Sequence, residues 1–173
     1  MLDHAALAKR VKEVALLEGD FLLRSGKRSK FYFDKYLFET HADILETLGA
    51  EIAKRIPAGV DRIAAPELGA VALGAAGCLA SRKPFFIVRN AKKDYGTAKQ
   101  IEGKVVAGET VVLVEDIITS GGQVLEAAKL LSGMGVKIAK VIVALDRQEG
   151  GREAIEAAGY VVEAILTKGD LGM

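Results

Sequence analysis

The segment from Val111 to Gln123, which reads VVLVEDIITSGGQ, carries the clearest chemical signature in the chain. Its four leading apolar residues predict a strand buried on both faces. Glu115 and Asp116 are then expected to emerge at the carboxyl end of that strand, where parallel sheets bind their ligands. Ionised carboxylates accept hydrogen bonds, and the neighbouring hydroxyl groups of a ribose donate them. The paired acids therefore predict a site for a sugar ring.

The turn after the acids has the composition of an anion cradle. Thr119 and Ser120 supply hydroxyl groups, and Gly121 and Gly122 let the backbone approach a ligand closely. A helix beginning near Gln123 would direct its free N–H groups at a phosphate. The alternative is an ordinary strand-to-helix loop with small capping residues, but capping explains neither the adjacent acids nor the double glycine. A sugar-phosphate site is the better interpretation.

This order of residues resembles the phosphoribosyl pyrophosphate signature of the type I phosphoribosyltransferases. In that family two acids follow a hydrophobic strand and precede a Thr-Ser/Thr-Gly-Gly turn. The resemblance implies that phosphoribosyl pyrophosphate is bound by Glu115, Asp116, Ile117, Ile118, Thr119, Ser120, Gly121, Gly122 and Gln123. Other parts of the chain have to indicate the base.

The loop 89–104, which reads RNAKKDYGTAKQIEGK, is rich in basic residues and poor in apolar ones. Long polar loops in compact domains often cover active sites, although charge alone would also suit a solvated surface loop. The loop resembles that of the orotate phosphoribosyltransferases, in which Arg-Lys, two residues and Lys-Asp-His/Tyr-Gly are followed by Glu-Gly. The matching positions are Arg89, Lys93, Asp94, Tyr95, Gly96, Glu102 and Gly103.

One position of this loop departs from the family, because Asn90 stands where a second basic residue is usual. In the family the loop acts on the neighbouring subunit's site. The resemblance therefore implies a homodimer in which loop 89–104 acts in trans, with phosphoribosyl pyrophosphate contacts from Arg89, Lys93 and Tyr95. It also implies that the catalytic residues are Lys93, Glu115 and Asp116.

Two further segments indicate the base. Residues 22–34, LLRSGKRSKFYFD, resemble the family's hood segment, where a basic residue and an aromatic pair meet the orotate ring. Residues 145–151, LDRQEGG, resemble the segment whose arginine binds the orotate carboxylate together with the signature threonine. Without the family, an arginine at a strand end is more often a surface residue. The implied orotate-binding residues are Arg24, Tyr32, Phe33, Thr119 and Arg147.

The segment 65–70, APELGA, lies where type I enzymes carry their pyrophosphate loop, whose amide groups could face an anion. Leu68 stands where a lysine occurs in one variant of that loop, so Gly69 is the more transferable feature. The resemblance as a whole implies transfer of the phosphoribosyl group to orotate, giving orotidine monophosphate and pyrophosphate in pyrimidine biosynthesis. Mg²⁺ is the implied cofactor, held mainly by substrate and water with no direct protein ligand.

Two rival functions stay open at this point. One is a phosphoribosyltransferase for another base, which would share the signature segment. The other is a non-catalytic regulator with the same fold, which should lack the basic loop or carry a surface for nucleic acid. Kinase and dehydrogenase functions are disfavoured, because no Walker A loop and no Gly-x-Gly-x-x-Gly after a strand occurs.

Composition limits the partners further. The 173 residues include 24 Lys and Arg against 23 Asp and Glu, so a net charge of +1 gives no overall attraction to nucleic acid. The single cysteine, Cys78, has no partner for a disulfide, which fits a reducing compartment. The apolar run from Leu68 to Ser81 has 14 residues, fewer than the roughly 20 that a membrane-spanning helix needs. We therefore expect a soluble cytoplasmic protein without a membrane partner.

The hydrophobic pattern predicts an α/β fold, with a doubly wound, mostly parallel sheet and a small N-terminal hood. We expect one domain over 1–173, in which 1–40 form the hood and first helix and 41–173 the nucleotide-binding core. A first helix is expected over 4–17, a hairpin from strands 21–23 and 31–36, and a second helix from Thr40 to Pro57. Beyond residue 61, strands are expected near 62–65, 84–88, 111–114, 137–145 and 160–166, and helices near 69–81, 123–134 and 152–158.

Overall fold

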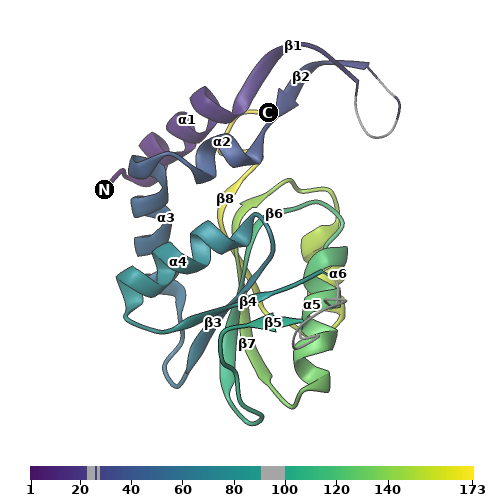
Figure 1. The fold of residues 1–173 in the computed structure, drawn as a ribbon. Coiled ribbons are helices and arrows are strands. Elements are labelled where there is room, and N and C mark those ends of the chain that lie inside the picture. The colour runs from purple at the N-terminus through teal and green to yellow at the C-terminus, as the bar shows by residue number, and fades with distance from the viewer. Residues whose placement is uncertain (23–25, 27, 91–99) are drawn as a thin grey trace.

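The computed structural model describes residues 1–22, 26, 28–90 and 100–173, and its centre is a β-sheet (Figure 1). In this part of the chain the sheet has six strands in the order β5-β4-β3-β6-β7-β8. All neighbours pair in parallel except β5 and β4, which are antiparallel. The strands are β3 (Arg62–Pro66), β4 (Phe85–Val88), β5 (Ile101–Glu102), β6 (Thr110–Ile118), β7 (Lys137–Asp146) and β8 (Val162–Thr167).

Helices cover both faces of this sheet, as the sequence predicted. On one face lie α3 (Ala42–Arg55) and α4 (Ala70–Ser81), with α1 (His4–Ala15) packed against α3. On the other lie α5 (Gly122–Gly133) and α6 (Gly151–Ala157). Because side chains alternate along a strand, Val112 and Val114 of β6 join the core under the first group, and Val111 and Leu113 join the core under the second. The doubly wound arrangement is confirmed.

The expected N-terminal hairpin is present, but its boundaries differ from the prediction. Strand β1 (Leu16–Leu22) pairs antiparallel with β2 (Arg28–Phe33), and the hairpin projects from the body of the molecule (Figure 1). A short helix, α2 (Lys35–Glu39), follows where a strand was expected to continue to Tyr36. The Asp34 side chain accepts a hydrogen bond from the Tyr36 backbone N–H at 3.1 Å, which starts the helix and ends the strand.

The core elements agree with the prediction to within a few residues, with two corrections. Strand β5 was not expected, because two residues are too few to show an alternating pattern. Strand β6 extends through the acids to Ile118, which pairs with Asp146 of β7. The expectation that Glu115 and Asp116 follow the strand is therefore wrong, and they lie within it. Apolar Ile117 and the buried Ile118 continue the strand beyond them.

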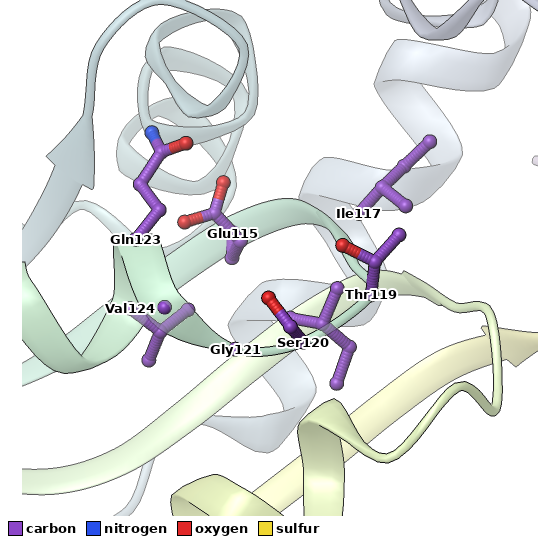
Figure 2. A pocket seen from close by; sticks show the side chains of 9 residues that line it. Glu115, Ile117, Thr119, Ser120, Gly121, Gln123 and Val124 are labelled. Atoms are coloured by element: carbon purple, nitrogen blue, oxygen red, sulfur yellow. The ribbon is translucent and has the colours of Figure 1, made fainter. Parts of the chain in front are cut away.

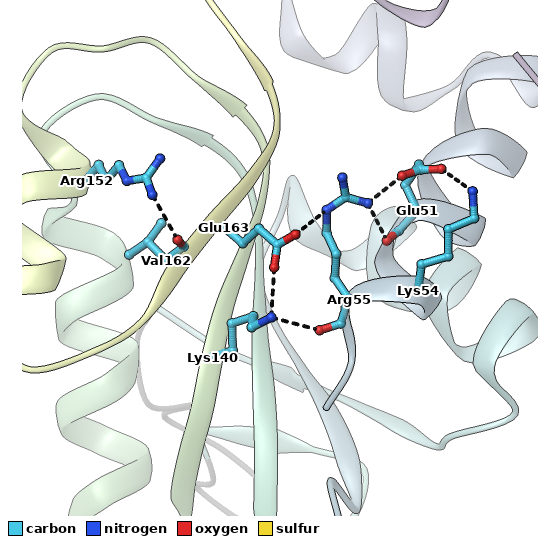
Figure 3. Close-up of polar contacts among 7 residues, drawn as sticks. All are labelled: Glu51, Lys54, Arg55, Lys140, Arg152, Val162 and Glu163. Atoms are coloured by element: carbon cyan, nitrogen blue, oxygen red, sulfur yellow. Dashed lines mark hydrogen bonds and ion pairs between the residues drawn. The ribbon is translucent and has the colours of Figure 1, made fainter. Parts of the chain in front are cut away.

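A network of charged groups joins the C-terminal end of α3 to the sheet (Figure 3). Arg55 pairs with Glu163 of β8 at 3.1 Å, and Lys140 of β7 reaches the same carboxylate at 2.8 Å. Lys140 also donates to the backbone carbonyl of Arg55 at 3.3 Å, and Glu51 pairs with Arg55 one turn earlier on the helix. These contacts fix the C-terminal end of α3 to β7 and β8.

Candidate active site

The two acids of β6 face opposite sides of the sheet. Glu115 is 2% exposed and Asp116 1% exposed. Glu115 lines a hollow with the turn that follows the strand, whereas Asp116 lines a cleft beneath the hood. Ile117, Thr119 and Gln123 border both spaces, so the hollow and the cleft adjoin. The acids therefore serve two parts of one site.

The hollow is formed by the turn between β6 and α5 (Figure 2). The Glu115 carboxyl group and the hydroxyl groups of Thr119 and Ser120 turn toward it. Gly121 has φ +77°, a left-handed conformation that favours glycine, and it precedes α5 without a side-chain cap. The first N–H groups of a helix have no partner within the helix. The turn and the helix N-terminus together form a cradle suited to an anion.

Close packing holds this cradle in place. A Cβ on Gly121 would lie 2.8 Å from the carbonyl oxygen of Gly151, and a Cβ on Gly151 would lie 2.5 Å from that of Thr119. The turn therefore rests directly on the backbone at the beginning of α6, with no side chain between them. The close contact therefore needs a glycine on both sides, Gly121 in the turn and Gly151 in α6. Gly121 was singled out from the sequence, but Gly151 was not.

Asp116 is the point where three segments meet. Lys35, from the first turn of α2, places its Nζ 2.6 Å from Asp116 Oδ2. Gly69 lies against the same carboxylate, since a Cβ there would be 1.4 Å from Oδ2 and 3.0 Å from Lys35 Nζ. Glu39, at the end of α2, is 3% exposed and interacts with Asp116. The hood, the segment 65–70 and the central strand are therefore joined at one side chain.

Burial and charge shift the pKa values around Asp116. Burial first, and then the charge of Asp116, raises the pKa of Glu115 well above its usual range. Burial first, and then the charge of Asp116 and hydrogen bonding with it, raises the pKa of Glu39 to about 9. Burial alone would lower the pKa of Lys35, but the hydrogen bond to Asp116 and the charge of Asp116, with smaller contributions from Tyr36 and Glu39, together outweigh burial and raise this pKa. At neutral pH Asp116 thus faces the cation Lys35 and the protonated Glu39, and its charge favours the protonated form of Glu115.

The raised pKa of Glu39 predicts a stability that depends on pH. Between the ordinary value of 4.5 and about 9, Glu39 stays protonated in the folded chain but ionises in the unfolded one. The free energy of unfolding should then fall by up to about 1.4 kcal/mol per pH unit as pH rises through this window. Residue 39 cannot ionise in the Glu39→Gln variant. The melting temperature of the variant minus that of the wild type should therefore increase steadily from about pH 5 to about pH 9.

The matched control for this effect is Glu46→Gln, on the exposed side of α3. It should follow the wild type at every pH. The charged groups that act on Glu39 are Lys35, Asp116 and Asp34, and all three are kept in both variants. A constant difference in melting temperature between Glu39→Gln and the wild type would contradict the shifted pKa.

The cleft beneath the hood collects most of the residues predicted to bind the base. Tyr32 and Phe33 of β2 line it together with Thr119 and Arg147. Tyr32 is 44% exposed, and its ring lies 5.5 Å from that of Phe21. Arg147 is held by a backbone bond from its N–H to the carbonyl of Ile118 at 3.1 Å, and its Nε lies 3.0 Å from Glu149. The predicted residue Arg24 lies outside the described residues.

The segment 65–70 is tied to the neighbouring elements by Glu67. Its backbone carbonyl accepts hydrogen bonds from the side-chain amides of Asn90 at 3.2 Å and Gln123 at 3.0 Å. Its carboxylate accepts from the Asn90 N–H at 3.0 Å and lies 3.6 Å from Arg89. Asn90, which departs from the family pattern, therefore acts as a clamp on this segment. The predicted residues Lys93 and Tyr95 lie outside the described residues.

Besides Gly151, three residues of the site were not predicted from the sequence, namely Lys35, Glu39 and Glu67. Lys35 directly follows Asp34, which caps α2. Had Asp34 been interpreted as a helix cap in the sequence, Lys35 would have been placed at the start of a helix next to the aromatic strand. Glu39 is an acid on the buried side of a five-residue helix, which is too short to show a period. Glu67 acts largely through its backbone carbonyl, and residue type gives no signal for that.

The donor set of the site bears on a metal ion. Among the residues that the structure describes, no three His, Cys, Asp or Glu side chains are grouped so as to hold one. Glu115 Oε2 is buried without a hydrogen-bond partner, and a carboxylate oxygen is the type of ligand that Mg²⁺ prefers. Glu115 therefore offers one oxygen with which the site could help to hold an ion. Within the described ranges, no helix is long and apolar enough to cross a membrane.

Comparisons with known proteins agree on one family. A model of the family described as "Phosphoribosyl transferase domain" matches residues 39–166. The chain is 40% identical over 166 residues to an orotate phosphoribosyltransferase of Methanocella arvoryzae, with 95% of each protein covered.

Solved structures give the same result. The chain is similar to the Mycobacterium tuberculosis orotate phosphoribosyltransferase in complex with Fe(III) dicitrate, with a TM-score of 0.88, 29% identity and coverage of 99% of this chain and 100% of that one. A structure of the same enzyme in complex with 5-phospho-alpha-D-ribosyl 1-diphosphate gives a TM-score of 0.83 at 29% identity, with coverage of 99% and 100%.

Proposed function

The chain belongs to the orotate phosphoribosyltransferases, and we propose that the site around β6 and α5 is where it transfers the phosphoribosyl group to orotate. The donor is phosphoribosyl pyrophosphate, and the products are orotidine monophosphate and pyrophosphate. The observation that carries this assignment is the placement of two buried acids and an uncapped helix N-terminus around two adjoining spaces, the hollow and the cleft. A ribose phosphate needs both of these features.

The phosphate and ribose ends of the donor occupy adjoining parts of this site. The 5-phosphate binds in the cradle, where backbone N–H groups of α5 and the hydroxyl groups of Thr119 and Ser120 donate to it. Asp116 and Glu115 accept hydrogen bonds from the ribose hydroxyl groups. During the reaction, positive charge develops on the ribose ring as the leaving group departs. The nearby negative charge of Asp116 stabilises it in a site from which water is excluded.

Orotate binds in the cleft beneath the hood. Tyr32 and Phe33 contact the flat ring, since both line the cleft. The sequence resemblance adds Arg24 as a cation that contacts orotate. The carboxylate of orotate binds Thr119 and Arg147, which follow β6 and β7 and line the same cleft. Arg147 exchanges its ion pair with Glu149 for a charged contact to the substrate.

Arg147→Ala is expected to raise the KM for orotate by about tenfold to a hundredfold, since a charged hydrogen bond contributes roughly 1.5–3 kcal/mol. The KM for phosphoribosyl pyrophosphate should change much less, because Arg147 lies on the base side of the cleft. Steady-state kinetics with each substrate varied in turn measures both values. Arg152→Ala is the control, because this arginine pairs with Glu156 on the exposed side of α6. An unchanged KM for orotate would remove Arg147 from the base site.

The pyrophosphate leaving group needs cations. Mg²⁺ bound to the substrate's oxygens supplies charge neutralisation when present. The loop 89–104 contributes Arg89, Lys93 and Tyr95, and the resemblance of its sequence supports a homodimer in which these residues act on the partner's site. Arg89 is held by Glu67 and Glu102 at 3.6 and 3.8 Å, in a position next to the segment 65–70. It would leave these carboxylates to reach the pyrophosphate in the partner's site.

A panel of bases tests the assignment. The purified chain is incubated with phosphoribosyl pyrophosphate and Mg²⁺, and pyrophosphate release is measured with orotate, uracil, adenine and hypoxanthine. Of the four bases, only orotate should cause pyrophosphate release. The amount of pyrophosphate released should equal the amount of orotidine monophosphate formed. Release with a purine but not with orotate would favour a phosphoribosyltransferase for another base. Binding of the donor without release for any base would favour a non-catalytic regulator.

A further inference from the structure

The lysine at the start of α2 lies where the ribose and pyrophosphate parts of the site meet. Lys35 Nζ is 2.6 Å from Asp116 Oδ2, on the ribose side. It is also the atom that a Cβ on Gly69 would meet at 3.0 Å, so it lies directly against the segment 65–70. A hood residue therefore reaches across the cleft to both of these elements. No motif of the sequence assigns it a function.

The segment 65–70 cannot neutralise an anion by itself. It reads APELGA, with no cation and one carboxylate, that of Glu67. The nearby Arg89 is held between Glu67 and Glu102, and Arg147 pairs with Glu149 on the base side. Pyrophosphate is strongly anionic, and a multiply charged group that leaves water needs a cation in contact with it. Among the described residues that line the cleft, Lys35 is the cation placed against this segment.

Lys35 has hydrogen-bond donors to spare. An ammonium group has three N–H donors, and the ion pair with Asp116 uses one of them. The side chain is 32% exposed, and it lines the cleft, so the other donors are accessible from it. The Tyr36 ring lies 5.3 Å from Nζ, which favours the charged form. The raised pKa of Lys35 agrees with a permanent cation at neutral pH.

We propose that Lys35 is a substrate-binding residue, whose ammonium group contacts the pyrophosphate of the donor while it stays bonded to Asp116. This inference rests on the proposed function and adds to it a cation supplied in cis by the hood. Lys35 would bring the two anions, Asp116 and pyrophosphate, to opposite sides of one ammonium group. Lys35 would thus fix the position of the leaving group relative to Asp116, the acid beside the ribose.

The test measures the affinity for magnesium pyrophosphate by calorimetry, which needs no base and no turnover. Lys35→Met is expected to weaken it by about tenfold or more, as the loss of a charged contact does. The affinity for orotidine monophosphate, which has a ribose but no pyrophosphate, should change much less. Lys54→Met is the matched control, because this lysine pairs with Glu51 on the exposed surface of α3. It should leave both affinities unchanged.

A purely structural role would give a different pattern. If Lys35 only fixed Asp116, Lys35→Met would weaken orotidine monophosphate as much as pyrophosphate, and the substitution would have no further effect on pyrophosphate in an Asp116→Asn background. Either result, or an unchanged pyrophosphate affinity, overturns the proposal. A further loss of pyrophosphate affinity in that background supports it. If the wild type itself binds neither pyrophosphate nor the nucleotide, the proposed function fails as well.

Discussion

Gly69→Ala is expected to lower kcat/KM by about a hundredfold or more, because displacements of about 1 Å at a reacting centre have effects of this size. A Cβ at position 69 would lie 1.4 Å from Asp116 Oδ2, so either the carboxylate or the segment 65–70 has to move. Movement of the carboxylate breaks the contact with Lys35 and disturbs the ribose site. Movement of the segment shifts the proposed pyrophosphate site. Steady-state kinetics and a melting curve measure the two consequences separately.

The matched control is Gly133→Ala, at the end of α5. A Cβ there meets no atom within 4 Å, and the residue does not need a positive φ. This variant should keep wild-type activity. Gly69→Ala should remain folded, because the disturbed contacts lie at the edge of the cleft rather than among the apolar residues of the core. Near-normal activity of folded Gly69→Ala would show that the contact between the segment 65–70 and Asp116 is not required.

Lys93→Ala is expected to lower kcat by about a hundredfold, the effect of removing one preorganised charge from a leaving group or oxyanion. The expectation rests on the resemblance of loop 89–104 and on the chemistry of the reaction, since Lys93 lies outside the described residues. The effect should fall on kcat and kcat/KM together, because the interaction is made mainly in the transition state. Lys104→Ala, at the far end of the same loop, is the control. Unchanged turnover would remove Lys93 from the mechanism.

Hybrid dimers test whether Lys93 acts in trans. Lys93→Ala and Arg147→Ala chains are each poor at orotate concentrations below the raised KM. In a mixed dimer, one site would combine an intact Arg147 with an intact Lys93 of the partner. After subunit exchange in an equal mixture, roughly a quarter of wild-type activity should return, because half of the dimers are mixed and each has one intact site. No recovery after proven exchange would show that Lys93 acts within its own chain.

The sequence predicted the architecture well because the signals were local and strong. The isoleucines and leucine of α3 recur every four residues, and the strands of the sheet are short apolar runs between turn residues. The hood was predicted less well. Residues 16–20 read LLEGD, which is not typical of a strand, and they form one because Arg28–Phe33 lies beside them. Tertiary pairing decided the structure of this segment.

The site shows the same division between local and long-range information. The cradle from Thr119 to Gln123 is one continuous segment, so its residues could be predicted together. The surroundings of Asp116 could not, because Lys35 and Gly69 come from 81 and 47 residues earlier in the chain and meet it only in the folded state. That Glu39 stays protonated also follows from burial beside Asp116, a property that no residue type reveals.

A calorimetric titration of the wild-type chain with phosphoribosyl pyrophosphate and Mg²⁺ measures whether the site around β6 and α5 binds the donor. Saturable binding of one donor molecule per chain is expected. Ser120→Asp, which places a negative charge in the phosphate cradle, should abolish this binding without unfolding the protein, because Ser120 is exposed. If the folded wild-type chain takes up no donor, or if Ser120→Asp binds it as tightly as the wild type does, the assignment of the cradle between β6 and α5 is contradicted.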